Sequence, residues 1–197
     1  KISCVVCDIK VNQKPKILSF ISFPTNNINK GSFINFQLLK EEIKELIAES
    51  SKLSQTEIKS VNLNIPLYDS SSFFYDSEIN IENELIKELH LKKAINQSDF
   101  FEKDLNHEIL MNYIVNYEID KKIFIGNPVG NFAKKLKLNF YRVSVNKNII
   151  NTYKNLFYEL KIHIAQFIPT PLSSALATLN QDDQDLGCIC IDLGDAT

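Results

Sequence analysis

The chain has 197 residues, 44% of them hydrophobic, and a formal net charge of −2. This composition is typical of a globular protein with a buried core, and the charge gives no reason to expect nucleic acid as a partner. No segment approaches the roughly 20 apolar residues that a bilayer span requires. Because a strand pattern follows the first residue at once, we expect no secretory leader. Because residue 1 is a lysine, we expect the chain to begin inside a longer protein.

The first part of the chain predicts the order strand, strand, helix, strand. Two apolar, β-branched runs flank a turn-rich segment that contains Pro15, so they predict a hairpin. Apolar residues then recur at helical spacing after Asn35, which we expect to be the N-cap of a helix. The last strand alternates apolar and polar residues, which predicts half-burial. The expected bounds are 2–10, 16–23, 35–52 and 60–66.

A polar, turn-rich segment at 68–72 indicates a boundary in the chain. The pattern beyond it predicts a separate α+β unit over about 69–145, within the usual size range of a domain. Leu136, Leu138 and Phe140 alternate with polar residues there, so they are expected to face the core. The expected elements of this unit are a short strand at 78–81, a helix at 86–101 and strands at 108–119, 123–125 and 135–145.

The aromatic residues of this middle unit have two interpretations. Tyr113 and Tyr117 are predicted to lie on one face of their strand, and Phe140 and Tyr141 also lie in a strand pattern. Core packing is the first interpretation of such strand-spaced aromatic residues, and a surface for a partner protein is the second.

The last part of the chain returns to alternating helices and strands. A helix is expected at 148–161, a strand at 164–168, and a short helix at 172–179 that Pro171 opens in its first turn. Asp182, Asp183 and Asp185 indicate a solvated acidic loop rather than a metal cluster.

The chain then closes on a predicted buried strand, 187–191, which ends in Asp192. Glycine in the turn beyond it, at Gly194, lets backbone amides approach an anion closely. A carboxylate at such a strand end can hold a metal ion through water or orient an attacking water. The pattern alone favours an ordinary turn.

The four cysteines, Cys4, Cys7, Cys188 and Cys190, invite a zinc interpretation. All four lie in apolar strand patterns, where a free cysteine packs as a small hydrophobic residue, so we favour core packing. The three histidines share no spacing and no neighbouring ligand residues, which indicates ordinary structural positions.

Four motifs in order resemble the FtsA family of bacterial cell-division proteins, within the actin-like ATPase superfamily. They are a Lys-Gly segment before a long helix, a Gly-x-x-Pro-x-Gly turn followed by Leu-x-Leu, a Pro-Leu-Ser-Ser-Ala stretch, and a closing Leu-Gly-strand-Asp loop. The matching residues are 30–34, 125–138, 171–175 and 186–197. In the closing loop, Asp195 and Ala196 replace family glycines, which puts close wrapping of a phosphate in doubt.

The resemblance implies an α/β fold: an actin-like (ribonuclease H-like) ATPase subdomain, made of 1–68 and 146–197, interrupted by an inserted α+β subdomain, 69–145. It implies ATP and Mg²⁺ as cofactors, with Asp192 as the metal residue. Implied phosphate contacts are Gly194, Asp195 and Thr197 of the second phosphate loop, and Lys1, which would close a first phosphate loop lying before the chain. No catalytic residue is assigned, and the implied activity is at most a slow ATPase.

The resemblance further implies a cytoplasmic division scaffold, peripheral to the inner face of the cell membrane, that polymerises and tethers the tubulin-like FtsZ ring at the septum. The inserted subdomain would contact filament neighbours and later division proteins, and a C-terminal amphipathic helix absent from this chain would bind the membrane. The alternatives are a pilus-assembly ATPase of the PilM type and a small-molecule kinase of the same superfamily.

Overall fold

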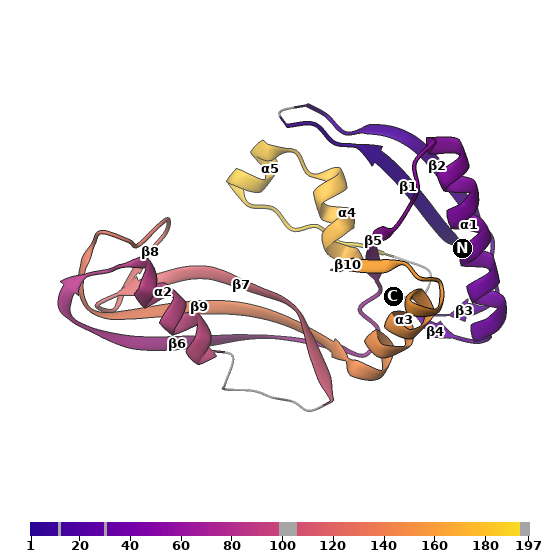
Figure 1. Ribbon diagram of the computed structural model, residues 1–197. Helices are drawn as coiled ribbons and strands as arrows, with labels where there is room; N and C mark the ends of the chain where they lie inside the picture. The colour runs from indigo at the N-terminus through magenta and orange to yellow at the C-terminus, as the bar shows by residue number, and fades with distance from the viewer. Residues whose placement is uncertain (12, 30, 99–105, 194–197) are drawn as a thin grey trace. The chain divides into compact units, whose positions relative to one another are not determined.

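The computed structural model describes residues 1–11, 13–29, 31–98 and 106–193. The chain divides into two compact units. The first, called unit 1, comprises Lys1–Tyr68 and Ile149–Thr197, and the second, unit 2, comprises Asp69–Asn148. Figure 1 labels their helices and strands.

The described strands of unit 1 form three two-stranded sheets. Two are antiparallel and one is parallel. The antiparallel pairs are β1 (Ile2–Asp8) with β2 (Lys16–Phe23) and β3 (Ile28–Asn29) with β4 (Ser32–Phe33); the parallel pair is β5 (Ser60–Ile65) with β10 (His163–Pro169). The described helices of unit 1 are α1 (Phe36–Ser54), α3 (Lys147–Glu159, whose first residues belong to unit 2), α4 (Thr170–Thr178) and α5 (Gln181–Leu186).

Helix α1 begins where the sequence predicts. Asn35 has an extended backbone conformation (φ −134°), and its side-chain Oδ1 accepts a hydrogen bond from the Leu38 amide at 3.1 Å. This bond satisfies one of the amides that a helix N-terminus leaves without an intrahelical partner. Asn35 is therefore the N-cap, as expected.

One core holds the strands of unit 1 against its helices. Leu39 of α1 packs with Leu156 and Phe157 of α3, all at most 4% exposed. Ile2 of β1 and Ile164 of β10 pack against this same cluster, with further apolar residues of β5. Among the described residues, the hairpin and the parallel pair therefore share one hydrophobic core although they belong to separate sheets.

Unit 2 is a four-stranded sheet in the order β6-β9-β7-β8, with one helix packed on it. All neighbouring strands are antiparallel. Its elements are β6 (Ser70–Leu85), α2 (Glu88–Ser98), β7 (His107–Ile119), β8 (Lys122–Phe124) and β9 (Phe132–Asn146). Leu136, Leu138 and Phe140 of the central strand β9 are at most 1% exposed and pack under α2 with Ala94, which confirms the predicted core positions.

Two expectations for unit 2 are wrong. Strand β6 runs from Ser70 to Leu85, far beyond the predicted 78–81, because it pairs with β9 from end to end, past the polar segment that suggested a turn. Tyr113 and Tyr117 lie on opposite faces, since a bulge at Val115 shifts the alternation of β7. Tyr113 is 48% exposed, whereas Tyr117 packs against the core.

Two expectations for the end of the chain are also wrong. Residues 182–185 lie in helix α5, because Asn180 and Asp183 form a reciprocal capping box. The segment 187–191 is not a strand: Ile189 and Ile191 are exposed, and no described strand lies alongside to satisfy their backbone groups. Cys188 and Cys190 are consequently exposed rather than packed in a core.

Within the parts of the chain that the structure describes, no helix combines the length and hydropathy needed to cross a bilayer.

A buried tyrosine in unit 1 predicts a pH dependence of stability. The Tyr153 hydroxyl donates to the Gly31 carbonyl at 3.3 Å, and its ring meets Phe33 edge-on at 4.8 Å. Burial raises the pKa of Tyr153 to about 12. The folded-state pKa of Tyr153 lies above the ordinary value of 10. The contribution of the protonated Tyr153 side chain to the unfolding free energy is therefore fully present below pH 10 and is lost as the pH rises from there through 12. The loss is about 2–3 kcal/mol of unfolding free energy.

Urea unfolding of the wild-type and Tyr153→Phe proteins between pH 8 and 12 checks this expectation. Other groups titrate equally in both proteins, so the difference between their unfolding free energies isolates Tyr153. The wild type should lose its advantage over the variant above pH 10; parallel curves over the whole range would contradict the assignment.

Candidate functional site

The candidate site lies at the carboxyl ends of the parallel strands β5 and β10. Ile65 and Pro169, the last residues of the two strands, are in register, and α4 starts at once with Thr170. Ligands in open α/β sheets bind outside the carboxyl ends of the strands. The order strand, proline and helix thus brings the N-terminus of α4 to this edge.

Backbone amides at the start of α4 have no side-chain cap. The N-cap residue is Pro169, which makes no capping hydrogen bond, and Pro171 follows in the first turn. The positive end of the helix dipole is consequently left facing the strand edge without a carboxylate or hydroxyl cap from position 169.

Two serines in the first turns of α4 bind residues from other segments. Ser173 Oγ donates to Asn64 Oδ1 of β5 at 2.9 Å, and Ser174 Oγ donates to Asp192 Oδ2 at 2.8 Å. The first bond ties the helix to the neighbouring strand. The second holds an exposed carboxylate beside the first half of α4, although the segment around Asp192 has no regular structure.

Only part of the predicted phosphate clamp is placed by the structure. Asp192 lies beside α4, and Lys1 is exposed immediately before β1. No described contact joins Lys1 to Asp192. Gly194, Asp195 and Thr197 lie outside the described residues. Across residues 1–11, 13–29, 31–98 and 106–193, no group of three or more His, Cys, Asp or Glu residues is arranged to hold a metal ion.

Sequence reasoning missed Asn64, Ser173 and Ser174 as site residues. The signal for the serines was available, because two hydroxyl residues follow the helix-opening Pro171. Their partners are 109 and 18 positions away in the chain, and the sequence does not show that pairing. With Asp192 they form a polar group next to uncapped amides, an arrangement able to bind an anion together with a hydrated cation.

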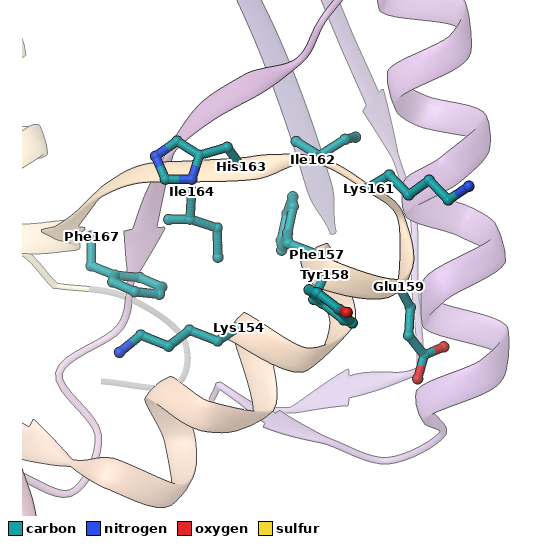
Figure 2. Close-up of a pocket in the computed structure, with 9 residues that line it drawn as sticks. All are labelled: Lys154, Phe157, Tyr158, Glu159, Lys161, Ile162, His163, Ile164 and Phe167. Atoms are coloured by element: carbon teal, nitrogen blue, oxygen red, sulfur yellow. The ribbon is translucent and has the colours of Figure 1, made fainter.

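A hollow of unit 1 lies elsewhere (Figure 2). It lies between α3 and β10, and neither α4 nor residues 187–193 contribute to its lining. It is therefore not part of the Asp192 site.

These features describe a mixed α/β protein in which a helix N-terminus without a side-chain cap and the Asp192 carboxylate lie near the carboxyl ends of two parallel strands. In sequence, the chain is similar over its whole length to the bacterial cell-division protein FtsA. It is 27% identical to FtsA of Buchnera aphidicola from Schizaphis graminum, 19% to that of Neisseria meningitidis and 20% to that of Escherichia coli K12. These alignments cover 100% of this chain and 47% or 48% of each relative.

The relatives confirm the resemblance to FtsA that the four motifs predicted. The chain spans about half the length of the curated relatives it matches. No protein-family model matches it. Among solved structures, the PilM-PilN type IV pilus biogenesis complex contains a chain that is 11% identical, with a TM-score of 0.48, over 88% of this chain and 46% of that one.

Proposed function

We propose that the full-length protein is a cell-division scaffold of the FtsA type. It binds ATP with Mg²⁺, polymerises and tethers the FtsZ ring to the inner face of the cytoplasmic membrane, with a membrane helix outside this chain. The observation that carries this proposal is the sequence similarity to FtsA proteins from several bacteria, which extends over the whole of this chain. Residues 1–68 and 146–197 would form the actin-like subdomain, and 69–145 the inserted one.

The Asp192 site supplies the chemistry for the nucleotide. Amides at the start of α4 suit a phosphate, since helix N-termini attract anions, and the Asp192 carboxylate suits Mg²⁺ through a water molecule. Ser174 keeps that carboxylate beside the helix. We assign no general base, so hydrolysis would be slow and would rely on Asp192 to orient water.

Fluorescent labelling of the full-length protein in its own host tests the scaffold role. We expect a ring at the division site that depends on FtsZ. A protein that instead follows the pilus machinery and ignores FtsZ would support the PilM-type alternative and contradict the proposal.

We further propose that the face of the unit 2 sheet opposite α2 contacts later division proteins. An aromatic row crosses three strands there: Tyr141 of β9 lies opposite Phe74 of β6 and Tyr113 of β7. The Phe74 and Tyr141 ring centroids are 5.1 Å apart, and Phe74 is 74% exposed. Exposed aromatic residues in a cluster are typical of protein interfaces.

Carboxylates lie beside this aromatic row on the same face. Asp76 of β6 is opposite Asn139 of β9. Asn139 Nδ2 donates to Glu118 Oε1 at 2.9 Å, and this bond keeps the pKa of Glu118 below its ordinary value. The face therefore carries aromatic rings next to two carboxylates, those of Asp76 and Glu118, which lie 3.8 and 3.5 Å from the Lys137 ammonium between them.

Replacing both Phe74 and Tyr113 by alanine is expected to leave the division ring intact but to stop the recruitment of later division proteins, so that cells grow as undivided filaments. The physical reason is loss of about 1 kcal/mol or more per buried aromatic contact. Fluorescence microscopy of one late division protein measures it. The matched control is Phe74→Tyr with Tyr113→Phe, which keeps the rings; normal recruitment by the double-alanine variant would contradict the assignment.

A further inference from the structure

The sheet of unit 2 exposes apolar side chains at the end where β7 turns into β8 and where β9 begins (Figure 1). Ile123 of β8 is 71% exposed, Phe132 of β9 is 70% exposed, and Ile125, just after β8, is 86% exposed. Leu85, the last residue of β6, lies opposite Phe132 in register and is 42% exposed. We call residues 85, 120–125 and 132–134 the β8 end of unit 2.

Two of these side chains share the face of the sheet opposite α2. Ile123 is in register with Glu118, whose own partner on β9 is Lys137, between two core residues of that strand. Phe132 directly precedes Ala133, which is buried in the core. Because side chains alternate along a strand, Ile123 and Phe132 both point away from α2. They are therefore outside the core of unit 2 and can contact another surface.

Three lysines gather around these apolar side chains. Lys121 lies in the turn between β7 and β8, Lys122 begins β8, and Lys134 lies near the start of β9. Asp120 draws the turn and β9 together, because its Oδ1 accepts hydrogen bonds from the amides of Lys134 and Lys135 at 3.0 and 2.9 Å. The fold thus brings three positively charged side chains to one end of the sheet.

The positive charge of the β8 end is not balanced by ion pairs. Residues 119–135 contain four lysines and one carboxylate, which gives a formal net charge of +3. Lys135 is paired with Glu78 at 2.6 Å. Among the described residues, no ion pair includes Lys121, Lys122 or Lys134. These three ammonium groups are therefore available to an anionic partner.

The turn that carries Lys121 has a strained backbone. Ile119 and Lys122 are in register, so Asp120 and Lys121 form a two-residue turn, and their φ angles are 48° and 70°. Such a turn needs a left-handed backbone at both positions, and glycine is the usual second residue. A lysine there is less favourable than a glycine, since its Cβ is crowded in this conformation. Local stability therefore does not explain the lysine, and we look to its charge.

The residue types of the β8 end select a lipid surface rather than a protein as the partner. Protein interfaces are depleted in lysine and enriched in arginine and tyrosine, and residues 119–135 contain neither arginine nor tyrosine. Aliphatic side chains beside lysines suit an anionic membrane, where the ammonium groups reach the lipid phosphates. The carboxylate of Glu84 lies across β9 from the turn and is paired with Lys87 at 2.8 Å.

We propose that the β8 end of unit 2 binds the surface of an anionic bilayer. Ile123, Ile125 and Phe132 enter the boundary between headgroups and acyl chains, and the three lysines bind lipid phosphates. This contact goes beyond the proposed scaffold function, in which a helix outside this chain binds the membrane. A second contact on the same molecule raises the overall affinity, because it forms at a high effective concentration. It also fixes the orientation of unit 2 against the bilayer.

Quenching of a tryptophan by brominated lipids tests the proposal. This chain contains no tryptophan, so Ile125→Trp adds one reporter to it, and the wild-type signal is subtracted as background. The full-length protein is mixed with vesicles of brominated phosphatidylcholine, with or without phosphatidylglycerol. We expect strong quenching with the anionic lipid and weak quenching without it. Ile109→Trp, near the other end of β7 and 42% exposed in the wild type, is the matched control and should stay unquenched.

Lys121→Gly separates the charge from the stability of the turn. Glycine fits the turn better, so the thermal midpoint of unfolding should stay the same or rise. Loss of the charge should raise the lipid concentration for half-maximal quenching of the Ile125→Trp reporter by about five-fold. Lys92→Gln, which removes an exposed charge from α2, should change neither quantity.

The outcomes also distinguish this contact from the scaffold proposal. Vesicle binding of the full-length protein without quenching of the Ile125→Trp reporter would overturn the contact and leave the scaffold proposal intact. Absence of any vesicle binding would contradict both. Equal quenching with and without phosphatidylglycerol, or no effect of Lys121→Gly, would overturn the role of the lysines. A reporter that is already shielded from water in the absence of lipid would indicate a protein partner or a second copy at this end, and would overturn the proposal too.

Discussion

Replacing Asp192 by asparagine in the full-length protein is expected to weaken ATP binding in the presence of Mg²⁺ by about ten-fold to a hundred-fold. Asparagine keeps an oxygen that can accept the hydrogen bond from Ser174, so the local geometry survives. The change removes the negative charge that would hold the hydrated cation. Isothermal titration with a non-hydrolysable ATP analogue measures the effect.

Two comparisons make this result specific to the cation. Without Mg²⁺, the wild type and Asp192→Asn should bind the analogue with similar affinity, because the carboxylate then has no cation to hold. Ser174→Ala should have a smaller effect with Mg²⁺, since it frees the carboxylate from α4 but keeps its charge. If the wild type and Asp192→Asn bound the analogue with equal affinity in the presence of Mg²⁺, the assignment of Asp192 to the nucleotide site would be contradicted.

Replacing Phe140 by alanine is expected to cost about 3–5 kcal/mol of unfolding free energy in unit 2. Phe140 is 1% exposed at the centre of the sheet, under α2, and stacks on Tyr75 with ring centroids 4.8 Å apart. Removing the ring leaves a cavity between the sheet and the helix. Hydrogen exchange of β9 amides in the full-length protein measures the loss locally.

Phe74→Ala is the matched control for that substitution. It removes the same ring from the same sheet, but from the exposed face, so we expect a cost of about 1 kcal/mol or less. The two changes should therefore separate stability from function: Phe140→Ala loosens unit 2, while loss of Phe74 impairs partner contact. Equal protection of β9 in both variants would contradict the assignment of faces.

Elements with a strong local signal could be predicted from the sequence. Helix α1 follows from apolar spacing and an asparagine cap, and the core face of β9 from strict alternation at Leu136, Leu138 and Phe140. In both cases the residues within the element contain the pattern that predicts its structure.

Features that depend on a distant partner could not be predicted. The length of β6 is set by its pairing with β9. The face of the sheet on which Tyr117 lies is set by a bulge in β7, where β7 pairs with β9. The run at 187–191 has strand composition, but an apolar run becomes a strand only beside another edge. The capping box of α5 was a local signal that sequence reasoning overlooked.

The candidate site shows the same difference between local signals and contacts with distant residues. Asp192 could be singled out because a carboxylate follows an apolar run before a glycine. Its bond to Ser174, and the bond of Ser173 to Asn64, depend on the chain returning α4 to the edge of β5. The residue types were visible in the sequence, but the contacts between them arise only in the folded chain.

Recruitment of FtsZ to lipid vesicles by the full-length protein tests the scaffold proposal most directly. Vesicles of bacterial polar lipids are sedimented with purified FtsZ, with and without the protein, in the presence of Mg²⁺ and ATP. The proposal predicts that FtsZ enters the vesicle pellet only when the protein is present. FtsZ that stays in the supernatant, although the protein itself sediments with the vesicles, would contradict it.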